Sequence, residues 1–429
     1  MKALSVRLAR RAYSDPLVKT SAGLFLAFAI SGVANYGYQV AMGRLLTPQE
    51  FGSLNALLGV FVVLSVPVAT LMMVISRRTA EYFAVGNLAG VRSLFERINL
   101  KVGGWGIAGL VAWGMCSGML ADYLRTPSLI PVILLGICIF LAVMVPINAG
   151  ILQGVQDYRR FTLLQALGGP MRFLLCVTPV FLGLGVNGAL SGLLATNAGT
   201  WMLAWLFVRK HLEKGTGESP LEPLAWKEAL PVMAANLSFA VMTQMDLILV
   251  NRLFPAAEAA RYAAAAVLGR TVIYIPGTLV MALFPMVSEK KALKADARPL
   301  LIKAILLTLA LSGAGALIFL VSPQGVLNLL FGSRYLESAG LLRYFGLAML
   351  PMALLMIFFQ YTVAQGQSEF SWIMLGGAVT EMVLIGFFHQ SPMAVLIAVG
   401  VTGALLCLIG FLRYRSTHVS TGVYAYECA

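Results

Sequence analysis

The chain has 429 residues, of which 59% are hydrophobic and 11% are charged, and its formal net charge is +13. A soluble globular protein has roughly a quarter of its residues charged, so this composition excludes an ordinary soluble domain and indicates a membrane protein. Whether the basic excess indicates nucleic-acid binding depends on where the basic residues lie.

Apolar stretches long enough to span a membrane recur along the whole chain. A helix needs about 20 residues to cross the hydrocarbon core. Twelve such stretches are present: Thr20 to Met42, Phe51 to Ile75, Val102 to Leu120, Leu129 to Leu152, Thr162 to Leu184, Asn187 to Val208, Ala229 to Val250, Tyr262 to Val287, Leu301 to Val321, Leu341 to Ala364, Phe370 to His389 and Met393 to Leu412. The sequence therefore predicts an all-α, polytopic membrane protein with 12 transmembrane helices.

The basic residues alternate between the two sides of these spans. With the N-terminus in the cytoplasm, 23 Lys and Arg residues fall in inner segments and six in outer segments. The positive-inside rule then places both termini in the cytoplasm. The basic excess is explained as a topology signal, and the same Lys and Arg residues are placed to contact anionic membrane lipids. No nucleic-acid partner is expected.

A weak internal repeat divides the chain into two halves. Arg44, Leu45 and Glu50 reappear 208 positions later as Arg252, Leu253 and Glu258, and Gln153-Gly154 reappears 212 positions later as Gln365-Gly366. Paired halves with an even number of spans are typical of transporters whose halves have the same orientation in the membrane. The Gly-, Pro- and charge-rich segment after span six reads as a linker. We therefore predict an N-terminal six-helix lobe (1–208), a cytoplasmic linker (209–227) and a C-terminal six-helix lobe (228–429).

Cysteine and histidine residues give no sign of a metal or disulfide site. The five cysteines are scattered and four lie in apolar spans, and the three histidines lie far apart in sequence. No metal and no cofactor is expected.

Three segments carry a resemblance to a known family: N-Y-G-Y-Q-V-A-M-G-R-L-L-T-P-Q-E-F-G-S-L from Asn35, I-L-Q-G-V-Q-D-Y-R-R-F from Ile151, and M-D-L-I-L-V-N-R-L-F-P-A-A-E-A-A-R-Y from Met245. Together they resemble polysaccharide transporters, the Wzx-type oligosaccharide flippases of the multidrug/oligosaccharidyl-lipid/polysaccharide (MOP) superfamily. The resemblance implies two pseudo-symmetric six-helix lobes around a central cavity that opens alternately to each side of the bacterial inner membrane. It also implies a lipid-linked sugar as substrate and other polysaccharide-assembly proteins as partners.

Four charged residues fall inside predicted spans. Counting about 1.5 Å per residue, Arg172, Arg270 and Glu381 lie near mid-depth and Asp246 lies nearer the outer side. An ionised group at the bilayer centre costs at least ~2.5 to 3.5 kcal/mol, so each needs a partner or a wet cavity.

We predict that Arg172 and Arg270 line a cavity, where a guanidinium binds phosphate oxygens bidentately. The alternative is a structural ion pair, with Arg270 bound to Asp246, and Arg172 bound to Glu381 or to a backbone carbonyl. Asp246 and Glu381 are also candidates for coupling to H⁺ or Na⁺, with static ion pairing as the alternative.

The remaining site predictions concern the membrane surfaces and uncharged polar groups. Arg78 is a candidate for receiving an anionic headgroup at the cytoplasmic side, with a positive-inside anchor as the alternative. Asn236 and Gln244 are candidates for hydrogen bonds to sugar hydroxyls, with helix bridging as the alternative. Arg44, Glu50, Arg252 and Glu258 are candidate gate residues at outer helix ends.

The function predicted from the sequence is that of a flippase for a lipid-linked oligosaccharide or an exopolysaccharide intermediate, acting without covalent chemistry. An ion-coupled multidrug exporter of the same superfamily is the first alternative, and mid-depth arginines point away from it. A non-transporting scaffold of a polysaccharide synthase complex is the second. A membrane glycosyltransferase or polymerase is disfavoured because the outer loops are too short to carry a catalytic platform.

Overall fold

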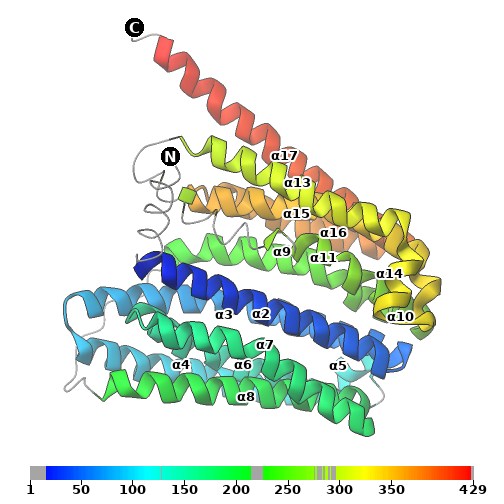
Figure 1. Cartoon of the computed structure of the whole chain (residues 1–429), viewed down its shortest axis with the longest axis horizontal. Coiled ribbons are helices and arrows are strands. Elements are labelled where there is room, and N and C mark those ends of the chain that lie inside the picture. The colour runs from blue at the N-terminus through cyan, green and yellow to red at the C-terminus, as the bar shows by residue number, and fades with distance from the viewer. Residues whose placement is uncertain are drawn as a thin grey trace, which may run out of the picture. The chain divides into compact units, whose positions relative to one another are not determined.

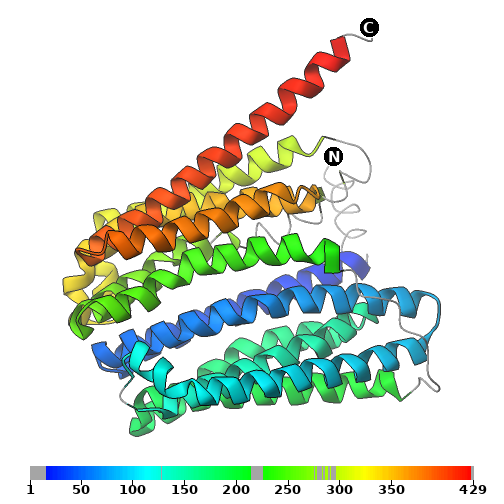
Figure 2. The ribbon, with the colours of Figure 1, turned by 180° about the vertical axis from the view of Figure 1, so that it is seen from behind.

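The structure is a computed structural model that describes residues 16–126, 128–213, 226–274, 276–277, 283, 286–287, 290 and 296–426. Throughout these residues every regular element is a helix. The predicted all-α class is therefore confirmed. The chain divides into two units, and Figures 1 and 2 show that each contains long helices lying side by side.

Unit 1 comprises Met1–Leu46 and Pro67–Trp226. Its helices are α2 (Pro16–Leu45), the second half of α3 (Pro48–Ala84), α4 (Leu88–Met115), α5 (Ser117–Tyr123), α6 (Ile130–Gly154), α7 (Tyr158–Pro179), the π-helical turn η1 (Val180–Leu184) and α8 (Gly185–Leu212). Helix α7 packs against both α2 and α8, and α6 packs against α4 and α8. Asn87 and Asp157 begin α4 and α7 as N-caps, because their side chains accept hydrogen bonds from free backbone N–H groups of the first turn.

Unit 2 comprises Thr47–Val66 and Lys227–Ala429. It contains α9 (Trp226–Leu253), α10 (Ala256–Gly269), α11 (Thr271–Tyr274), α13 (Arg298–Val321), α14 (Pro323–Leu330), the 3₁₀ helix η2 (Ser333–Ser338), α15 (Ala339–Ala364), α16 (Glu369–Phe387) and α17 (Pro392–Tyr426). Helix α15 packs against α10, α13 and α17.

Helix α3 is divided between the two units, whereas the sequence predicts it in a single lobe. Its first half packs in unit 2, where a Cβ on Gly52 would lie 3.1 Å from the Ala260 backbone. Its second half packs in unit 1, where Gly150 of α6 meets Met72 and Ile75. The two halves meet at Pro67, which lies inside the helix. Segment 47–66 thus groups with the C-terminal half, although the sequence predicts it inside the lobe 1–208.

The described helices account for most of the predicted spans. Nine described helices are long and apolar enough to cross a membrane, and the pair α4 and α5, which bend by 62° at Cys116, adds a tenth. One of the nine is a 55-residue run that contains both α7 and α8. A Cβ on Gly192 would collide with the backbone of Leu175, whereas a straight helix would separate these two positions by about 25 Å.

The chain therefore reverses at Gly183 and Gly185, which both have positive φ, and α7 and α8 are separate spans. This separation raises the number of described spans to eleven. Of the one remaining predicted span, Tyr262 to Val287, the described part consists of α10, α11 and isolated residues beyond Tyr274.

The first repeat forms the same helix corner in both halves. Helices α2 and α9 end at Leu45 and Leu253, and helices α3 and α10 begin at Pro48 and Ala256. Both pairs of positions differ by the offset that the sequence predicts (253 − 45 = 256 − 48 = 208). The repeated letters therefore mark structurally equivalent corners.

The second repeat has a different backbone register from its letters. The turn after α6 and the turn after α15 each contain one residue with positive φ, Gln156 (61°) and Gly366 (72°), at an offset of 210 (366 − 156 = 210) rather than 212. Each turn has the same pair of hydrogen bonds, from Gln156 to Gln153 and Asp157 to Leu152, and from Gly366 to Val363 and Gln367 to Thr362. Gly154 lies inside the last turn of α6, where a Cβ would collide with Thr79. The matched glycines therefore have different roles.

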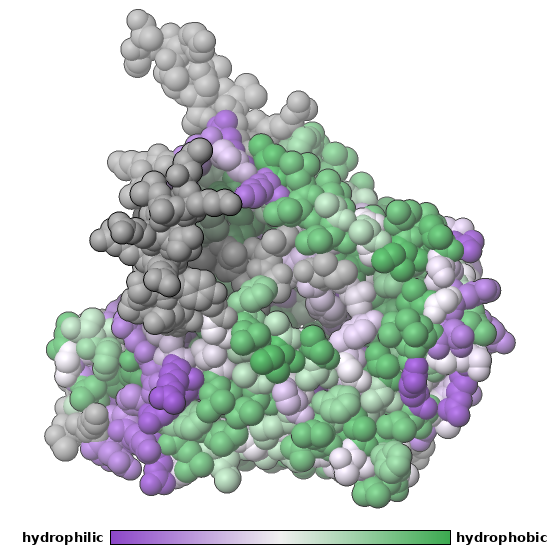
Figure 3. Space-filling model, in the orientation of Figure 1, coloured by the Kyte–Doolittle hydropathy of each residue, from purple (hydrophilic) through white to green (hydrophobic). Residues whose placement is uncertain are grey.

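Much of the molecular surface is apolar. Figure 3 shows hydrophobic residues along the sides of the helices and polar residues gathered at helix ends. Large apolar side chains on this surface include Val33 (75% exposed), Trp105 (81%) and Phe181 (75%). A soluble monomer rarely exposes such continuous apolar surface, so the helices face lipid.

Candidate functional site

Arg172 of unit 1 lies between neutral polar and aromatic partners. It is on α7, close to the midpoint of the helical run from Tyr158 to Leu184, and so near the middle of the span. Its Nη1 donates to Oδ1 of Asn35 at 3.4 Å, and its guanidinium carbon lies 4.6 Å from the centroid of the Tyr38 ring. Both partners are on α2.

The position of α2 against α7 depends on a close helix approach. A Cβ on Gly169 would lie 2.5 Å from the carbonyl oxygen of Ser31, so only glycine permits this contact without displacement. Ser31 also accepts a hydrogen bond from Nδ2 of Asn35 at 2.8 Å. This bond turns the Asn35 carbonyl toward Arg172, which fixes the amide in an accepting orientation.

Within the described residues no carboxylate is paired with Arg172, whose guanidinium donates to the Asn35 amide. Its Nε is buried and has no hydrogen-bond partner there. Nε and Nη2 form one edge of the guanidinium, and the Asn35 bond uses the other nitrogen, Nη1. The site therefore holds an uncancelled positive charge, and its Nε is not committed to a protein acceptor.

Arg270 of unit 2 has the opposite electrostatic environment. Its Nη2 donates to Oδ1 of Asp246 at 2.5 Å, and its Nη1 donates to Oε1 of Gln244 at 3.3 Å. Tyr262 donates from its hydroxyl to the other Asp246 oxygen at 2.9 Å. The Arg270 side chain is 5% exposed and that of Asp246 is 1% exposed.

This arrangement is a buried ion pair, which is the alternative considered for Arg270. Its Nε, like that of Arg172, has no hydrogen-bond partner in the described part of the chain. The two arginines share an unpartnered Nε and differ in charge balance, because only Arg270 is paired with a carboxylate among the described residues. Because Asp246 already cancels the charge of Arg270, this guanidinium is a weaker candidate for binding phosphate than the sequence predicts.

Glu381 of α16 lies near this ion pair. The charges of Asp246 and Arg270 both act on its carboxyl. It is 1% exposed, and neither carboxyl oxygen has a hydrogen-bond partner among the described residues. Of the four predicted intramembrane charges, three thus come together in unit 2, and Arg172 belongs to unit 1.

The remaining predicted ligands have local partners. Arg78 binds Glu81 on its own helix, with Nη1 and Oε2 2.7 Å apart. Asn236 donates to the carbonyl of Val232 on α9 at 2.8 Å, which is an intrahelical bond rather than a helix bridge. Gln244 accepts from Arg270. Each of these side chains is thus engaged by the protein itself in this structure.

The predicted gate residues are found at the repeated helix corners. Glu50 accepts from the backbone N–H (3.0 Å) and hydroxyl (2.8 Å) of Thr47, and its own N–H donates to the Thr47 hydroxyl. This reciprocal pattern is a capping box that starts α3. Glu258 lies in the first turn of α10, and Arg44 and Arg252 lie in the last turns of α2 and α9. In these places each charge interacts favourably with the opposite partial charge at that end of the helix. The structure assigns Glu50 a capping role, and the gate role of all four stays a prediction.

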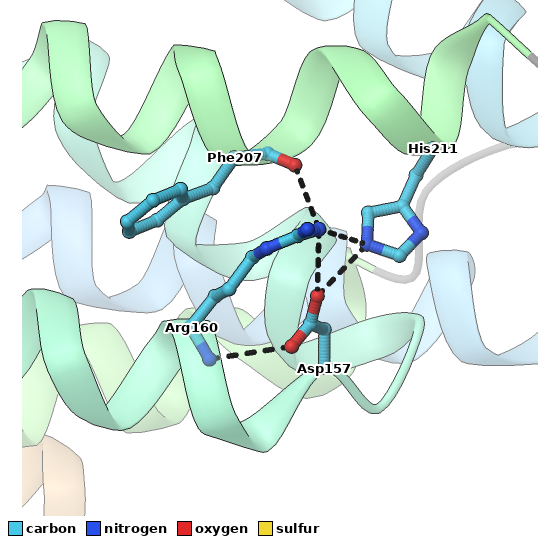
Figure 4. Close-up of polar contacts among 4 residues, drawn as sticks. All are labelled: Asp157, Arg160, Phe207 and His211. Atoms are coloured by element: carbon cyan, nitrogen blue, oxygen red, sulfur yellow. Dashed lines mark hydrogen bonds and ion pairs between the residues drawn. The ribbon is translucent and has the colours of Figure 1, made fainter.

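A polar cluster that the sequence did not predict joins the ends of α7 and α8 (Figure 4). Oδ2 of Asp157 lies 3.0 Å from both Nη1 of Arg160 and Nε2 of His211, and Oδ1 accepts from the Arg160 backbone N–H at 3.2 Å. Nη1 of Arg160 also donates to the Phe207 carbonyl at 3.5 Å. The Arg160 guanidinium and the His211 ring thus converge on one carboxyl oxygen.

The carboxyl group of Asp157 remains acidic in this cluster. Burial acts to raise the pKa of Asp157, but hydrogen bonds from His211 and the Arg160 backbone, with the charge of Arg160, outweigh it and lower the pKa below its ordinary value of 3.8. Asp157 and His211 are 54 positions apart in the chain. The only sequence signal is an Asp at a helix start, which indicates an N-cap and not its second partner.

Sequence and structure comparisons place the chain among known proteins. A family described as polysaccharide biosynthesis protein matches residues 41–340. No curated protein matches the sequence. Among solved structures, an inward-facing multidrug resistance MATE family transporter of the MOP superfamily is 17% identical with a TM-score of 0.75, covering 90% of this chain and 94% of that chain.

Two further structures share this fold. A transporter of the same description in an outward-facing conformation is 17% identical with a TM-score of 0.68, covering 93% of this chain and 95% of that one. A MOP superfamily transporter from Pyrococcus furiosus is 16% identical with a TM-score of 0.69 and the same two coverages. The chain is therefore a multi-span membrane protein that belongs to the polysaccharide biosynthesis protein family and has the fold of MOP superfamily transporters.

Proposed function

We propose that this protein is a flippase that moves a lipid-linked oligosaccharide, or an exopolysaccharide intermediate, from the cytoplasmic to the outer leaflet of the bacterial inner membrane by alternating access. Both termini are cytoplasmic in this proposal. The matching family supports a role in polysaccharide assembly, and the fold supports transport. The observation that carries the proposal is the uncancelled charge of Arg172.

A lipid-linked sugar has a phosphate or pyrophosphate between its polyprenyl tail and its sugars, and this group is the hardest part to bring across hydrocarbon. A buried positive charge lowers that barrier only if no protein carboxylate already cancels it. Arg172 meets this condition in the described residues, because its contacts are an amide and an aromatic ring. A guanidinium also offers two parallel N–H donors to phosphate oxygens, which a Lys ammonium does not.

The test uses the full chain in proteoliposomes, with a fluorescent sugar linked to polyprenyl pyrophosphate. Dithionite, which does not cross membranes, quenches the fluorophore on the outer leaflet and reports movement. Arg172→Gln is expected to slow movement at least roughly tenfold, since a hydrogen bond to a charged group contributes about 1.5 to 3 kcal/mol. Arg172→Lys should recover only part of the rate.

The matched control is Arg413→Gln, which removes an arginine that is paired with Glu369 at 2.8 Å and is half exposed. It should leave the rate unchanged. Equal rates for wild type and Arg172→Gln, with both proteins folded, would reject the assignment.

An ion-coupled multidrug exporter is the second candidate, and one observation favours it. In the described part of unit 2, two buried carboxyl groups lie near one arginine, and Glu381 has no hydrogen-bond partner there. Such a site suits cation coupling. Efflux of ethidium from the same vesicles, without movement of the sugar lipid, would replace the flippase with the exporter.

A further inference from the structure

The repeated corners define which residues of the two halves are equivalent. The ends of α2 and α9, Leu45 and Leu253, differ by 208 (253 − 45 = 208), and Tyr38 of α2 and Asp246 of α9 differ by the same offset (246 − 38 = 208). Tyr38 and Asp246 therefore occupy the same position in the first helix of each half.

The turns after α6 and α15 extend this equivalence to the fifth span of each half. Counted from the positive-φ residue of each turn, Gln156 or Gly366, the places of Arg172 and Glu381 differ by only one position (172 − 156 = 16 and 381 − 366 = 15). One position is about 100° of rotation around an α-helix, so the count places Arg172 and Glu381 at the same level of α7 and α16 rather than on the same face. Both nonetheless lie near the equivalent position of the first helix, because Arg172 contacts Tyr38 in unit 1 and the charge of Asp246 acts on Glu381 in unit 2.

The chemistry at these equivalent places is reversed in sign. Unit 1 has a cation with neutral partners on α2, and unit 2 has a carboxyl group, Glu381, beside a carboxylate on α9. Asp246 is balanced by Arg270, which directly follows α10. The equivalent place on α3 holds the apolar Val62 (270 − 208 = 62). Within the described part of unit 2, Glu381 is thus the member of this cluster that has no partner to balance its charge.

A bare carboxylate without hydrogen bonds in a buried site carries a large desolvation cost. Both oxygens of Asp246 are taken, one by Arg270 and one by Tyr262, so Asp246 is the fixed member of the cluster. The ionisable groups that act on Glu381 are Asp246 of α9 and Arg270. The charge of Glu381 in turn acts on Tyr262 of α10. In the described residues of α15 and α17, which also pack on α16, no charged group acts on it.

A metal ion fits this place poorly. Hard cations need several oxygen ligands, and among the described residues no group of three or more His, Cys, Asp or Glu side chains is placed to hold one. The guanidinium of Arg270 also repels a cation. A proton needs only the Glu381 carboxyl itself, and its uptake leaves the cluster of Asp246, Arg270 and Glu381 with no net charge.

We propose that Glu381 is a proton-binding site, the charge-reversed counterpart of the Arg172 anion site, and that it carries one proton while it is covered. The proposal deepens the proposed function and rests on it, because a proton released from unit 2 when the site opens to water supplies coupling for the movement of an anionic lipid. Its test does not depend on the substrate.

The experiment is infrared spectroscopy of the full chain in lipid at neutral pH, where a protonated carboxylic acid gives a C=O stretching band that carboxylates lack. Glu381→Gln should remove the intensity of one acid. Glu369→Gln should not remove it, because Glu369 is an exposed glutamate of the same helix that is bound to Arg413. Gln has nearly the shape of protonated Glu, so the Glu381→Gln variant should also keep the wild-type melting temperature.

Two results would overturn the proposal. The acid band could persist unchanged in Glu381→Gln. It could also be lost when sodium chloride replaces choline chloride at constant pH, which would identify sodium as the bound cation. A folded Glu381→Gln variant that lacks the band but still moves the sugar lipid without a pH gradient would leave the flippase intact and remove only the coupling role.

Discussion

Arg172 and Arg270 show two ways in which a protein holds an arginine inside an apolar bundle. Arg270 is bound to Asp246 and Gln244, so its charge is cancelled and its side chain holds the end of α10 against α9. Arg172 rests on an amide and an aromatic ring and keeps its charge. The same residue type is therefore paired with a carboxylate in one unit and with neutral groups in the other, and depth in the membrane does not distinguish them.

The largest effect on stability is expected from breaking the ion pair of unit 2. Asp246→Asn removes the carboxylate that Arg270 binds, and breaking a buried ion pair by removing one partner typically costs about 3 to 5 kcal/mol. Thermal unfolding in detergent should show this loss, and the double variant Asp246→Asn with Arg270→Gln should recover most of it. Arg172→Gln should change stability far less. Equal losses from Asp246→Asn and Arg172→Gln would remove the contrast between the two arginines.

The second effect concerns the helix contact that positions the partners of Arg172. Gly169→Ala places a Cβ against Ser31 and should cost about 1 to 3 kcal/mol, as overpacking usually does. Its neighbour supplies a matched control, because a Cβ on Gly168 meets nothing within 4 Å. Gly168→Ala should therefore be neutral or stabilising by up to about 1 kcal/mol through helix propensity. If the two variants melt alike, α2 and α7 are not in close contact.

A third effect separates the polar cluster at the ends of α7 and α8 from the buried ion pair. Asp157→Asn retains an N-cap but loses the charge that binds Arg160 and His211, and about 1 kcal/mol or less is expected at neutral pH. Because the pKa of Asp157 is lowered in the folded protein, the folded state binds fewer protons than the unfolded state near pH 3.8. The cluster therefore stabilises the protein above that pH, and this contribution disappears as pH falls through the lowered pKa.

Thermal unfolding of wild type and Asp157→Asn at a series of pH values measures this contribution. The difference in stability should shrink below about pH 4. A difference that grows on acidification would show the opposite shift.

The smallest effect compares the two equivalent turns after α6 and α15. Gln156 has a φ of 61°, which a side chain disfavours, whereas Gly366 has a φ of 72° and no side chain. Gln156→Gly should stabilise by roughly 0.5 to 1 kcal/mol, and Gly366→Ala should destabilise by a similar amount. Changes of the same sign in both variants would mean that the turns are not equivalent.

Sequence alone predicted the features that depend on local patterns. Long apolar runs indicated the helical membrane class, and the repeat at Arg44 and Arg252 marked equivalent helix corners because the corner is built from consecutive residues. The Gln-Gly repeat was out of register by two positions, since Gly154 permits a helix contact and Gly366 permits a turn.

The partners of the charged residues were harder to predict. Charges within apolar runs stand out, so Arg172, Arg270, Asp246 and Glu381 were found. Which of them pair depends on tertiary contacts, such as that between Arg172 and Asn35, 137 positions apart. The cluster of Asp157 and His211 was missed for the same reason.

The most direct test of the account is whether Arg172 binds a phosphate-bearing lipid. Farnesyl pyrophosphate, a short polyprenyl pyrophosphate, can be titrated into the purified full chain and into folded Arg172→Gln, with farnesol as the uncharged comparison. The account predicts that wild type binds farnesyl pyrophosphate roughly ten- to a hundredfold more tightly than the variant does, and that farnesol does not distinguish the two proteins. Equal affinity of the two proteins for farnesyl pyrophosphate would contradict it.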